Sequence, residues 1–176
     1  MTARNETLVV IDMQSRLAAA MQEYECVLSH VQKLMSVANL LGINVIITEQ
    51  NLHGLGCTDP RLDTTHATVL EKHTFSATGN AQLLENIGPA DKGMVYVCGM
   101  ESHVCVFHTV NALVSKGYNV TVLGDAVCSR NAQNKALALA QMRHNSVQVW
   151  PSESAIFFWL NSCEHPMFKE VLAFIK

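Results

Sequence analysis

Three residues whose side chains can take part in nucleophilic chemistry stand at the ends of apolar runs. They are Asp12 after "TLVVI", Lys72 at the end of "TVLEK" and Cys105 shortly after "VYVCG". A cysteine attacks only as its thiolate, and a free thiol with a pKa of about 8.5 is mostly protonated at neutral pH. A carboxylate can take the thiol proton and return it to a leaving group, while a lysine stabilises the developing charge. Together the three residue types suffice for attack on a carbonyl carbon.

Each of these residues also has an ordinary structural explanation. A cysteine near the start of a helix is more often a small buried residue than a nucleophile. Asp12 could cap a helix after the first strand, and Lys72 could be a solvated strand end. Taken singly, the structural explanations are the more common ones. However, because Asp12, Lys72 and Cys105 all stand at strand ends, catalysis is an equally good explanation for the three together.

The elements that must position these residues follow from the hydrophobic pattern. Short Val- and Ile-rich runs are continuously apolar, as is typical of strands covered on both faces. These runs predict strands over 7–11, 44–48, 68–72, 95–99, 119–123 and 146–150. Helical spacing predicts helices over 27–41, 80–87, 103–115, 132–143, 152–160 and 166–175. The alternation predicts an α/β fold in which a parallel sheet has helices on both faces.

In such a sheet, ligands bind outside the carboxyl ends of the strands. The residues that follow the predicted strands are therefore the ones expected to share a crevice. Besides Asp12, Lys72 and Cys105, Asp125 falls at such an end, after the fifth strand. The longest irregular stretch, 50–67, is about eighteen residues, and loops of that length in compact domains tend to be functional or mobile.

Size and composition limit the class of protein. A chain of 176 residues suits a single domain over 1–176, and 49% hydrophobic against 15% charged residues indicates a compact core. The net charge of −3 gives no reason to expect nucleic acid or an anionic membrane as partner. No apolar window is long enough to span a membrane, and a strand pattern begins almost at the N-terminus, so we expect a cytoplasmic protein. The six cysteines show no zinc-type spacing and are expected to be reduced.

Cofactor motifs are missing where they would be needed. The first strand is followed by "IDMQSRLA", without the glycines of a dinucleotide-binding turn, and the chain has no Walker motif. His53, His66 and His73 could be imagined as metal ligands, but their spacing is unspecific and solvated histidines are expected instead. We therefore expect no metal and no cofactor. A flavodoxin-like cofactor binder stays open as an alternative that a colourless purified protein would argue against.

Six segments in order resemble a known family over nearly the whole chain. They are "VVIDMQ" (9–14), "TEQNLHGLG" (48–56), "EKHTFSA" (71–77), "VCGMESHVCV" (97–106), "DAVCSR" (125–130) and "ALALAQMRHNSVQVWPSESAIFFWL" (136–160). The sequence is similar to the isochorismatase-like cysteine hydrolases, which include nicotinamidases and N-carbamoylsarcosine amidase. The "TEQ" element and the C-terminal segment "HPMFKEVLAFIK" resemble the isochorismatase-domain-containing branch most closely.

The resemblance implies a Rossmann-like three-layer sandwich with a six-stranded parallel sheet, and a catalytic triad of Asp12, Lys72 and Cys105. It also implies a non-proline cis peptide between Met100 and Glu101, and an oxyanion hole made by the backbone N–H groups of Glu101 and Cys105. Further expected contacts to a small-molecule substrate are Gln14, Gln50, Phe75, His103 and Val104. Family members commonly assemble, so a homo-oligomer, either a dimer or a tetramer, is expected.

Two departures from the family restrict the reaction. Metal-binding nicotinamidases carry an Asp-x-His element after the second strand, whereas this sequence has "TEQNLHGLG" there. True isochorismatases cleave a vinyl ether and lack the nucleophilic cysteine. The expected function is therefore hydrolysis of a C–N bond in a small amide through a thioester on Cys105. An ether hydrolase with Cys105 as a bystander, and a non-catalytic scaffold or binding protein, stay open as alternatives.

Overall fold

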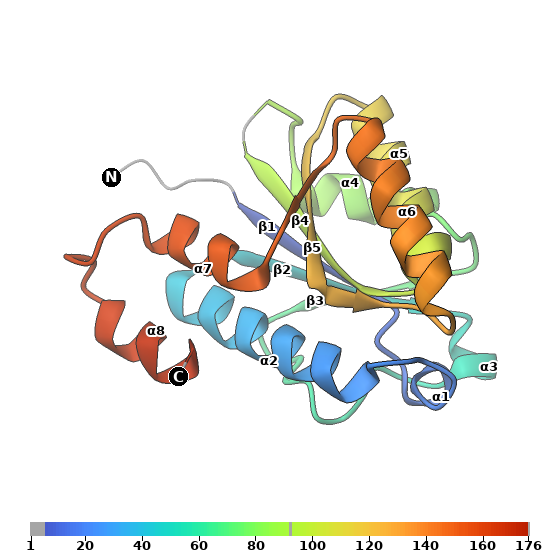
Figure 1. Cartoon of the computed structure of the whole chain (residues 1–176), viewed down its shortest axis with the longest axis horizontal. Coiled ribbons are helices and arrows are strands. Elements are labelled where there is room, and N and C mark those ends of the chain that lie inside the picture. Colours follow the sequence, from blue (N-terminus) through green and yellow to red (C-terminus); the bar gives the residue numbers. More distant parts are fainter. Residues whose placement is uncertain (1–5, 92, 176) are drawn as a thin grey trace.

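The computed structural model describes residues 6–91 and 93–175 of the chain. Its centre is a parallel sheet of six strands in the order β3-β2-β1-β4-β5-β6 (Figure 1). The strands are β1 (Thr7–Ile11), β2 (Asn44–Gln50), β3 (Thr68–Lys72), β4 (Met94–Met100), β5 (Asn119–Cys128) and β6 (Gln148–Trp150). The predicted α/β class and the six-stranded parallel sheet are confirmed.

Helices cover both faces of this sheet. The long helices are α2 (Tyr24–Leu41), α4 (Ala81–Ile87), α5 (Phe107–Ser115), α6 (Ala132–His144), α7 (Ser152–Leu160) and α8 (Phe168–Ile175). The short ones are α1 (Ser15–Ala18), α3 (Leu52–Leu55), the 3-10 turn η1 (Ala77–Gly79) and the π-helical turn η2 (Ser102–Val106). Helices α2, α7 and α8 lie on one face, and α4, α5 and α6 lie on the other (Figure 1).

The core is split by the sheet into two apolar layers. Along β1, Leu8 and Val10 pack into the layer under α2 and α7, whereas Val9 and Ile11 pack into the layer under α5 and α6. All four side chains are fully buried, because side chains of a strand alternate between the two covered faces. The Rossmann-like three-layer sandwich is confirmed.

Two predicted elements differ from the structure by more than three residues at one end, and the others agree more closely. The helix expected over 103–115 begins as the π-helical turn η2, and α5 follows it from Phe107. The strand expected to end at 123 continues to Cys128, because an irregularity shifts the β4–β5 pairing between Val97 and Gly99. Asp125 therefore lies inside β5, where its carboxylate accepts hydrogen bonds from the backbone N–H and the hydroxyl of Ser152. The expectation that Asp125 joins the crevice is not met.

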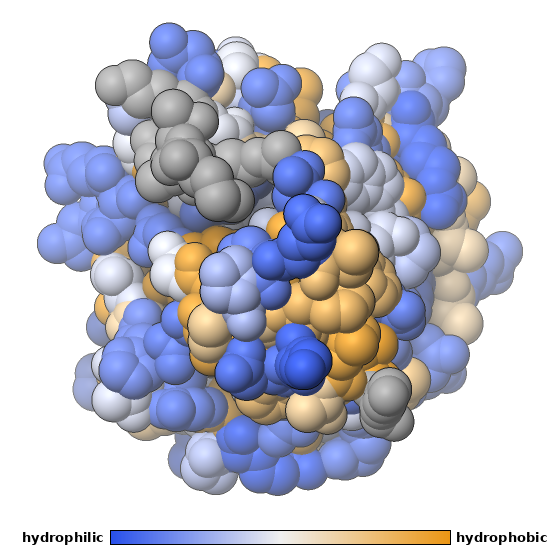
Figure 2. Space-filling model, turned by 90° about the vertical axis from the view of Figure 1, so that its left-hand side faces the viewer, coloured by the Kyte–Doolittle hydropathy of each residue, from blue (hydrophilic) through white to orange (hydrophobic). Residues whose placement is uncertain are grey.

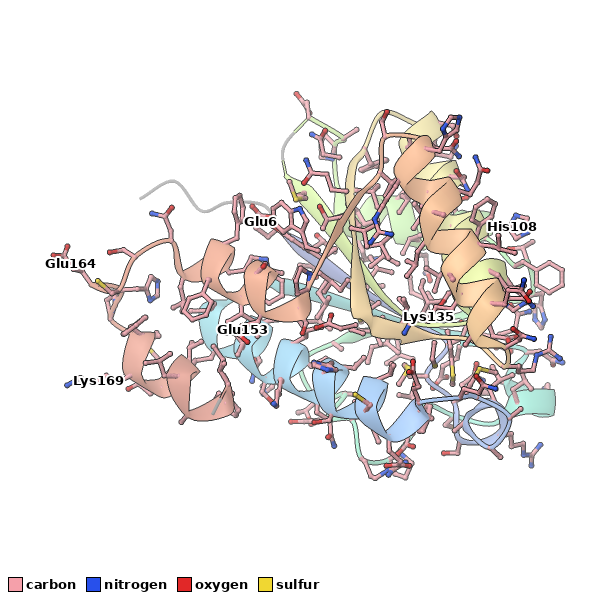
Figure 3. All side chains as sticks on the ribbon, in the orientation of Figure 1. Glu6, His108, Lys135, Glu153, Glu164 and Lys169 are labelled. Carbon is pink, nitrogen blue, oxygen red and sulfur yellow. The ribbon has the colours of Figure 1, made fainter. Side chains whose placement is uncertain are left out.

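The end of the molecule that carries α7 and α8 shows exposed apolar surface (Figure 2). Phe157 and Phe158 of α7 and Phe174 of α8 are 42%, 37% and 41% exposed. Figure 3 places Glu164 and Lys169 at this end and His108, at the start of α5, at the opposite end. The apolar surface therefore lies far from the turn that carries Cys105.

Candidate active site

The three candidate catalytic residues lie where the strand order of the sheet changes direction. The chain proceeds from β1 outward to β2 and β3, and then returns to the other side of β1 with β4, β5 and β6. Asp12 follows β1, Lys72 is the last residue of β3, and Cys105 lies in the turn after β4. Ligands of open α/β sheets bind at such a switch point, outside the carboxyl ends of the strands.

A buried ion pair is the centre of the site. Lys72 Nζ lies 2.8 Å from Asp12 Oδ2, and the two side chains are 1% and 0% exposed. Thr48 of the neighbouring strand donates its hydroxyl to Asp12 Oδ1 at 2.7 Å. Burial raises the pKa of Asp12 above its ordinary value, while Lys72 and the Thr48 hydrogen bond oppose that rise. A carboxylate with a raised pKa is a stronger base than one in water.

Oxygen atoms surround the ammonium group of Lys72. Besides Asp12, the ammonium donates to Gln50 Oε1 at 2.6 Å and to the backbone oxygens of Thr74 and Phe75 at 3.3 and 3.4 Å. A buried charge is tolerated only when it is paired and its hydrogen-bonding capacity is used. Since a lysine ammonium has three protons and no acceptor, these contacts hold it firmly in place.

Cys105 lies beside this pair with its thiol buried. Its residue is 7% exposed, and Sγ lies 4.0 Å from Gln50 Oε1. Burial raises the pKa of the Cys105 thiol to about 12, the negative charge of Asp12 adds to the rise, and Lys72 opposes it. Burial and the charge of Asp12 therefore oppose the thiolate that an N-terminal helical position alone would favour.

The backbone before Cys105 has two unusual features. The peptide bond between Met100 and Glu101 is cis, as the family resemblance implies. One residue earlier, Gly99 has φ +109°, and a Cβ there would overlap the backbone of Ile11. Gly99 and Ile11 are register partners in β4 and β1. Only glycine lets the two strands approach this closely, directly below the site.

The side chain of Gln14 forms hydrogen bonds with backbone atoms next to the site. Its Nε2 donates to the carbonyl oxygens of Gln50 (3.0 Å) and Gly56, and its Oε1 accepts the N–H of Gln50 at 2.8 Å. The side chain is fully buried. These contacts tie the segment after β2 to β1, so the structure gives Gln14 a positioning role; the predicted contact with substrate stays a prediction.

The other predicted contact residues lie around the triad at different depths. Phe75 is 60% exposed, and its ring stacks on His108 with centroids 6.4 Å apart. His103 Nδ1 lies 3.0 Å from Ser129 Oγ, which directs the imidazole toward the β5–α6 connection. Val104 is half-buried and packs on the layer under α5. Phe75 also contacts the ion pair, because its backbone oxygen accepts from Lys72 Nζ.

The side chain of Glu101 binds Arg130, whereas the role expected of Glu101 in an oxyanion hole concerns its backbone N–H. Its Oε2 accepts from Arg130 Nε at 3.0 Å and from the Arg130 backbone N–H at 3.1 Å. This ion pair joins η2 to the connection between β5 and α6. The ion pair does not involve the backbone N–H of Glu101, whose part in an oxyanion hole stays a prediction.

The sequence did not predict two hydrogen bonds of the site, from Thr48 to Asp12 and from Lys72 to Gln50. Thr48 pairs in register with Ile11, one residue before Asp12, which brings its hydroxyl to the carboxylate. Gln50 pairs in register with Lys72, which places its carboxamide against the ammonium. Both follow from strand register, which the strand lengths alone do not specify.

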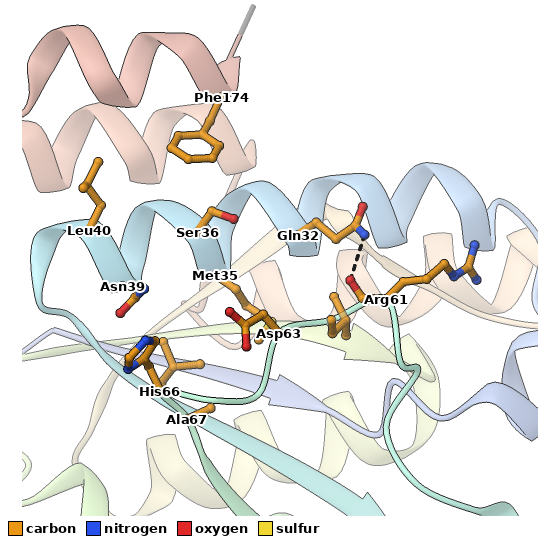
Figure 4. Close-up of a pocket in the computed structure, with 12 residues that line it drawn as sticks. Gln32, Met35, Ser36, Asn39, Leu40, Arg61, Asp63, His66, Ala67 and Phe174 are labelled. Carbon is orange, nitrogen blue, oxygen red and sulfur yellow. Dashed lines mark hydrogen bonds between the residues drawn. The ribbon is translucent and has the colours of Figure 1, made fainter.

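A separate cavity lies on the face of the sheet covered by α2. Its volume is about 370 Å³, and it is bounded by α2, the segment before β3 and Phe174 of α8 (Figure 4). Met35, Val45 and Leu62 line it together with His66. None of the triad residues borders this cavity.

No group of three or more His, Cys, Asp or Glu side chains is arranged to hold a metal ion within residues 6–91 and 93–175. His66 faces the α2 cavity, and His73 lies 3.8 Å from Glu71 at the surface. The histidines at 53, 66 and 73 therefore do not form a cluster with metal-binding geometry.

A doubly wound α/β domain with a thiol beside a buried carboxylate–ammonium pair, at the switch point of its sheet, defines the class of this protein. The isochorismatase domain model matches residues 6–154, and the chain belongs to that family. Isochorismatase domain-containing protein 2 of Xenopus laevis is 32% identical over 168 residues, covering 96% of this chain and 82% of the relative. The rat protein of the same name is 31% identical over 169 residues, covering 96% and 80%. A solved structure titled MAR1 ribonuclease from Caenorhabditis elegans is 31% identical, with a TM-score of 0.88 over 99% of this chain and 91% of that one.

Proposed function

We propose that this protein is a cysteine hydrolase that cleaves a C–N bond of a small amide through a thioester on Cys105. The observation that carries the proposal is the buried thiol of Cys105 beside the buried pair of Asp12 and Lys72. The pair supplies a base of raised pKa and a fixed positive charge next to the nucleophile. This combination is what attack by a resting thiol requires.

The proposed reaction has two stages. Asp12 takes the thiol proton as Sγ attacks the amide carbon, and the oxyanion accepts hydrogen bonds from the backbone N–H groups of Glu101 and Cys105. The tetrahedral intermediate then expels the amine, which receives the proton from Asp12, and the thioester is left on Cys105. In the second stage Asp12 takes a proton from water and the hydroxide attacks the thioester. The intermediate expels the Cys105 sulfur, which receives the proton back from Asp12, and the carboxylic acid leaves.

Lys72 keeps its proton throughout this sequence. Its contacts with Asp12 and three other oxygens hold the ammonium in place in the resting site. When the proton moves from sulfur to Asp12, the negative charge moves from the carboxylate to the sulfur, and the ammonium then stabilises the thiolate. The lysine therefore orients the base before the transfer and stabilises the nucleophile during it.

The test is a panel of small amides and ureas assayed for ammonia or amine release. We expect turnover by the wild type, none above background by Cys105→Ala, and wild-type rates from Cys98→Ala, which removes a buried thiol of β4. Rapid quenching followed by mass analysis is expected to show the acyl group on the peptide that contains Cys105. Activity that survives Cys105→Ala would contradict the covalent mechanism.

Two further substrates in the same panel address the alternatives. A vinyl ether of the isochorismate type tests ether hydrolysis, in which Cys105→Ala would stay active. Single-stranded RNA tests the activity named for the C. elegans structure. Cleavage of either one, with no amide turned over, would replace the proposed reaction.

No helix among the described residues is long and apolar enough to cross a membrane. The predicted cytoplasmic location, homo-oligomer and small-molecule substrate stay predictions of this proposal.

A further inference from the structure

The carboxamide of Gln50 lies between the ammonium and the thiol of the site. Gln50 is the last residue of β2 and pairs in register with Lys72. Its Oε1 accepts from Lys72 Nζ at 2.6 Å and lies 4.0 Å from Cys105 Sγ. Its Nε2 donates to the backbone oxygen of His73 at 2.9 Å. One oxygen atom thus faces both reactive groups.

The orientation of this carboxamide is fixed from two sides. The backbone of Gln50 exchanges two hydrogen bonds with the buried side chain of Gln14. An ammonium has only donors, so the side of the carboxamide that faces Lys72 must be the oxygen. The amide nitrogen is thereby directed to the His73 carbonyl oxygen, which can only accept.

The interaction of this oxygen with the protonated thiol differs from its interaction with the thiolate. A protonated thiol can donate its hydrogen toward Oε1, whereas a thiolate would face the lone pairs of that oxygen. The same oxygen accepts one of the protons of Lys72, so that proton is not available to a thiolate. Both effects favour the neutral thiol and oppose its ionisation.

We propose that Gln50 is a positioning residue that keeps Cys105 protonated in the resting site by holding Lys72 and offering the thiol an acceptor. The inference rests on the proposed function only in taking Cys105 as the nucleophile. Because the amide is neutral, it restrains the ammonium without adding a second negative charge beside the sulfur. Substrate binding at the sulfur replaces the acceptor and allows the proton to pass to Asp12.

The test is the pH dependence of Cys105 alkylation by iodoacetamide, followed by peptide mass mapping, in two variants of Gln50. Gln50→Glu keeps the shape and adds a negative charge, so we expect alkylation at pH 8 at least about tenfold slower than in the wild type, as for a rise of one unit in the pKa of the thiol. Gln50→Met keeps the length and removes the acceptor. We expect alkylation of Cys105 in this variant at pH 8 to be at least about threefold faster than in the wild type.

Alkylation of the other buried thiols distinguishes positioning from a merely structural role. If Gln50 only held the fold, Gln50→Met would also accelerate alkylation of the buried Cys98 and Cys128, and that result would overturn the inference. An unchanged rate at Cys105 in Gln50→Met would overturn it too. Gln82→Glu, at an exposed position of α4, adds the same charge elsewhere and is expected to leave the Cys105 profile unchanged. The readout needs no substrate, so it decides the role of Gln50 even if no amide is turned over.

Discussion

At the scale of single residues, the site depends on how charge is shared between Asp12, Lys72 and Cys105. The ion pair is complete without the thiol, because carboxylate and ammonium are 2.8 Å apart and buried. In the proposed mechanism, the nucleophile is therefore generated only when a proton moves to Asp12. This differs from sites in which a cysteine rests as a thiolate, stabilised by a nearby cation.

The first prediction concerns wild-type reactivity. We expect iodoacetamide to modify Cys105 at pH 7.5 at least tenfold more slowly than Cys26, Cys57 and Cys163, which are exposed. The reason is that burial and the charge of Asp12 raise the pKa of the Cys105 thiol to about 12, so little thiolate is present. Mass-mapped alkylation against time gives the rates. Faster modification of Cys105 than of these three would indicate a resting thiolate.

The second prediction separates reactivity from turnover. Asp12→Asn removes a negative charge that raises the pKa of the thiol and leaves the charge of Lys72, which lowers it. We therefore expect faster alkylation of Cys105 in this variant, while amide turnover falls by a factor of about 100 to 10,000, because the general base is lost. The two effects have opposite signs, so a variant that simply unfolds would not reproduce them. Equal loss of both would place Asp12 in a structural role alone.

At the scale of elements, the site depends on how closely β4 approaches β1. Gly99 has φ +109°, and a side chain there would overlap the backbone of Ile11, its partner in the neighbouring strand. The turn with Cys105 begins at Ser102, and only Met100 and Glu101 separate it from Gly99. A change in this approach would displace the nucleophile from Asp12.

The third prediction tests that approach with two glycines of positive φ. We expect Gly99→Ala to lower the free energy of unfolding by about 3 kcal/mol or more, since the strand backbone must move. Gly42→Ala, at the end of α2, has φ +69° with nothing within 4 Å of the added Cβ, and we expect a cost of about 1 kcal/mol. Urea unfolding of both variants gives the comparison. Equal costs would mean that the φ angle, and not the close approach, requires Gly99.

Hydrophobic runs were enough to predict most of the elements. The helix over 152–160 has the predicted bounds. Five of the apolar runs predicted the bounds of their strands to within two residues. The π-helical turn Ser102–Val106 and the length of β5 were not predictable, because both depend on how β4 and β5 pair. Local periodicity carries no information on that pairing.

The same limit applies to the candidate site. Strand ends and residue types were sufficient to bring Asp12, Lys72 and Cys105 together, and the family resemblance supplied the cis bond. The hydroxyl of Thr48 and the carboxamide of Gln50 depend on register across three strands. Register is determined by packing between elements far apart in sequence, so single-sequence patterns leave such partners undetermined.

At the scale of the whole molecule, buried thiols and a buried tyrosine with raised pKa values lower the free energy of unfolding at alkaline pH. Burial raises the pKa of Cys98 and, to about 12, the pKa values of Cys105 and Cys128. Burial and Asp59 also raise the pKa of Tyr24. In the unfolded chain the thiols ionise near pH 8.5, so above that pH the folded state binds more protons than the unfolded state. The free energy of unfolding must then fall as pH rises.

The fourth prediction is the size and origin of this fall. Three thiols that ionise only on unfolding lower the free energy of unfolding by up to about 4 kcal/mol per pH unit once the unfolded thiols are fully ionised, and the fall stops where the folded thiols ionise. We expect urea unfolding under reducing conditions to show a progressive loss of stability between pH 8.5 and pH 10.5. Cys105→Ala is expected to reduce the slope by about a third, whereas replacement of the exposed Cys163 by alanine leaves it unchanged, because that thiol is exposed in the folded protein too. A wild-type slope near zero would show that the buried thiols ionise in the folded state, and the neutral resting thiol on which the mechanism depends would have to be abandoned.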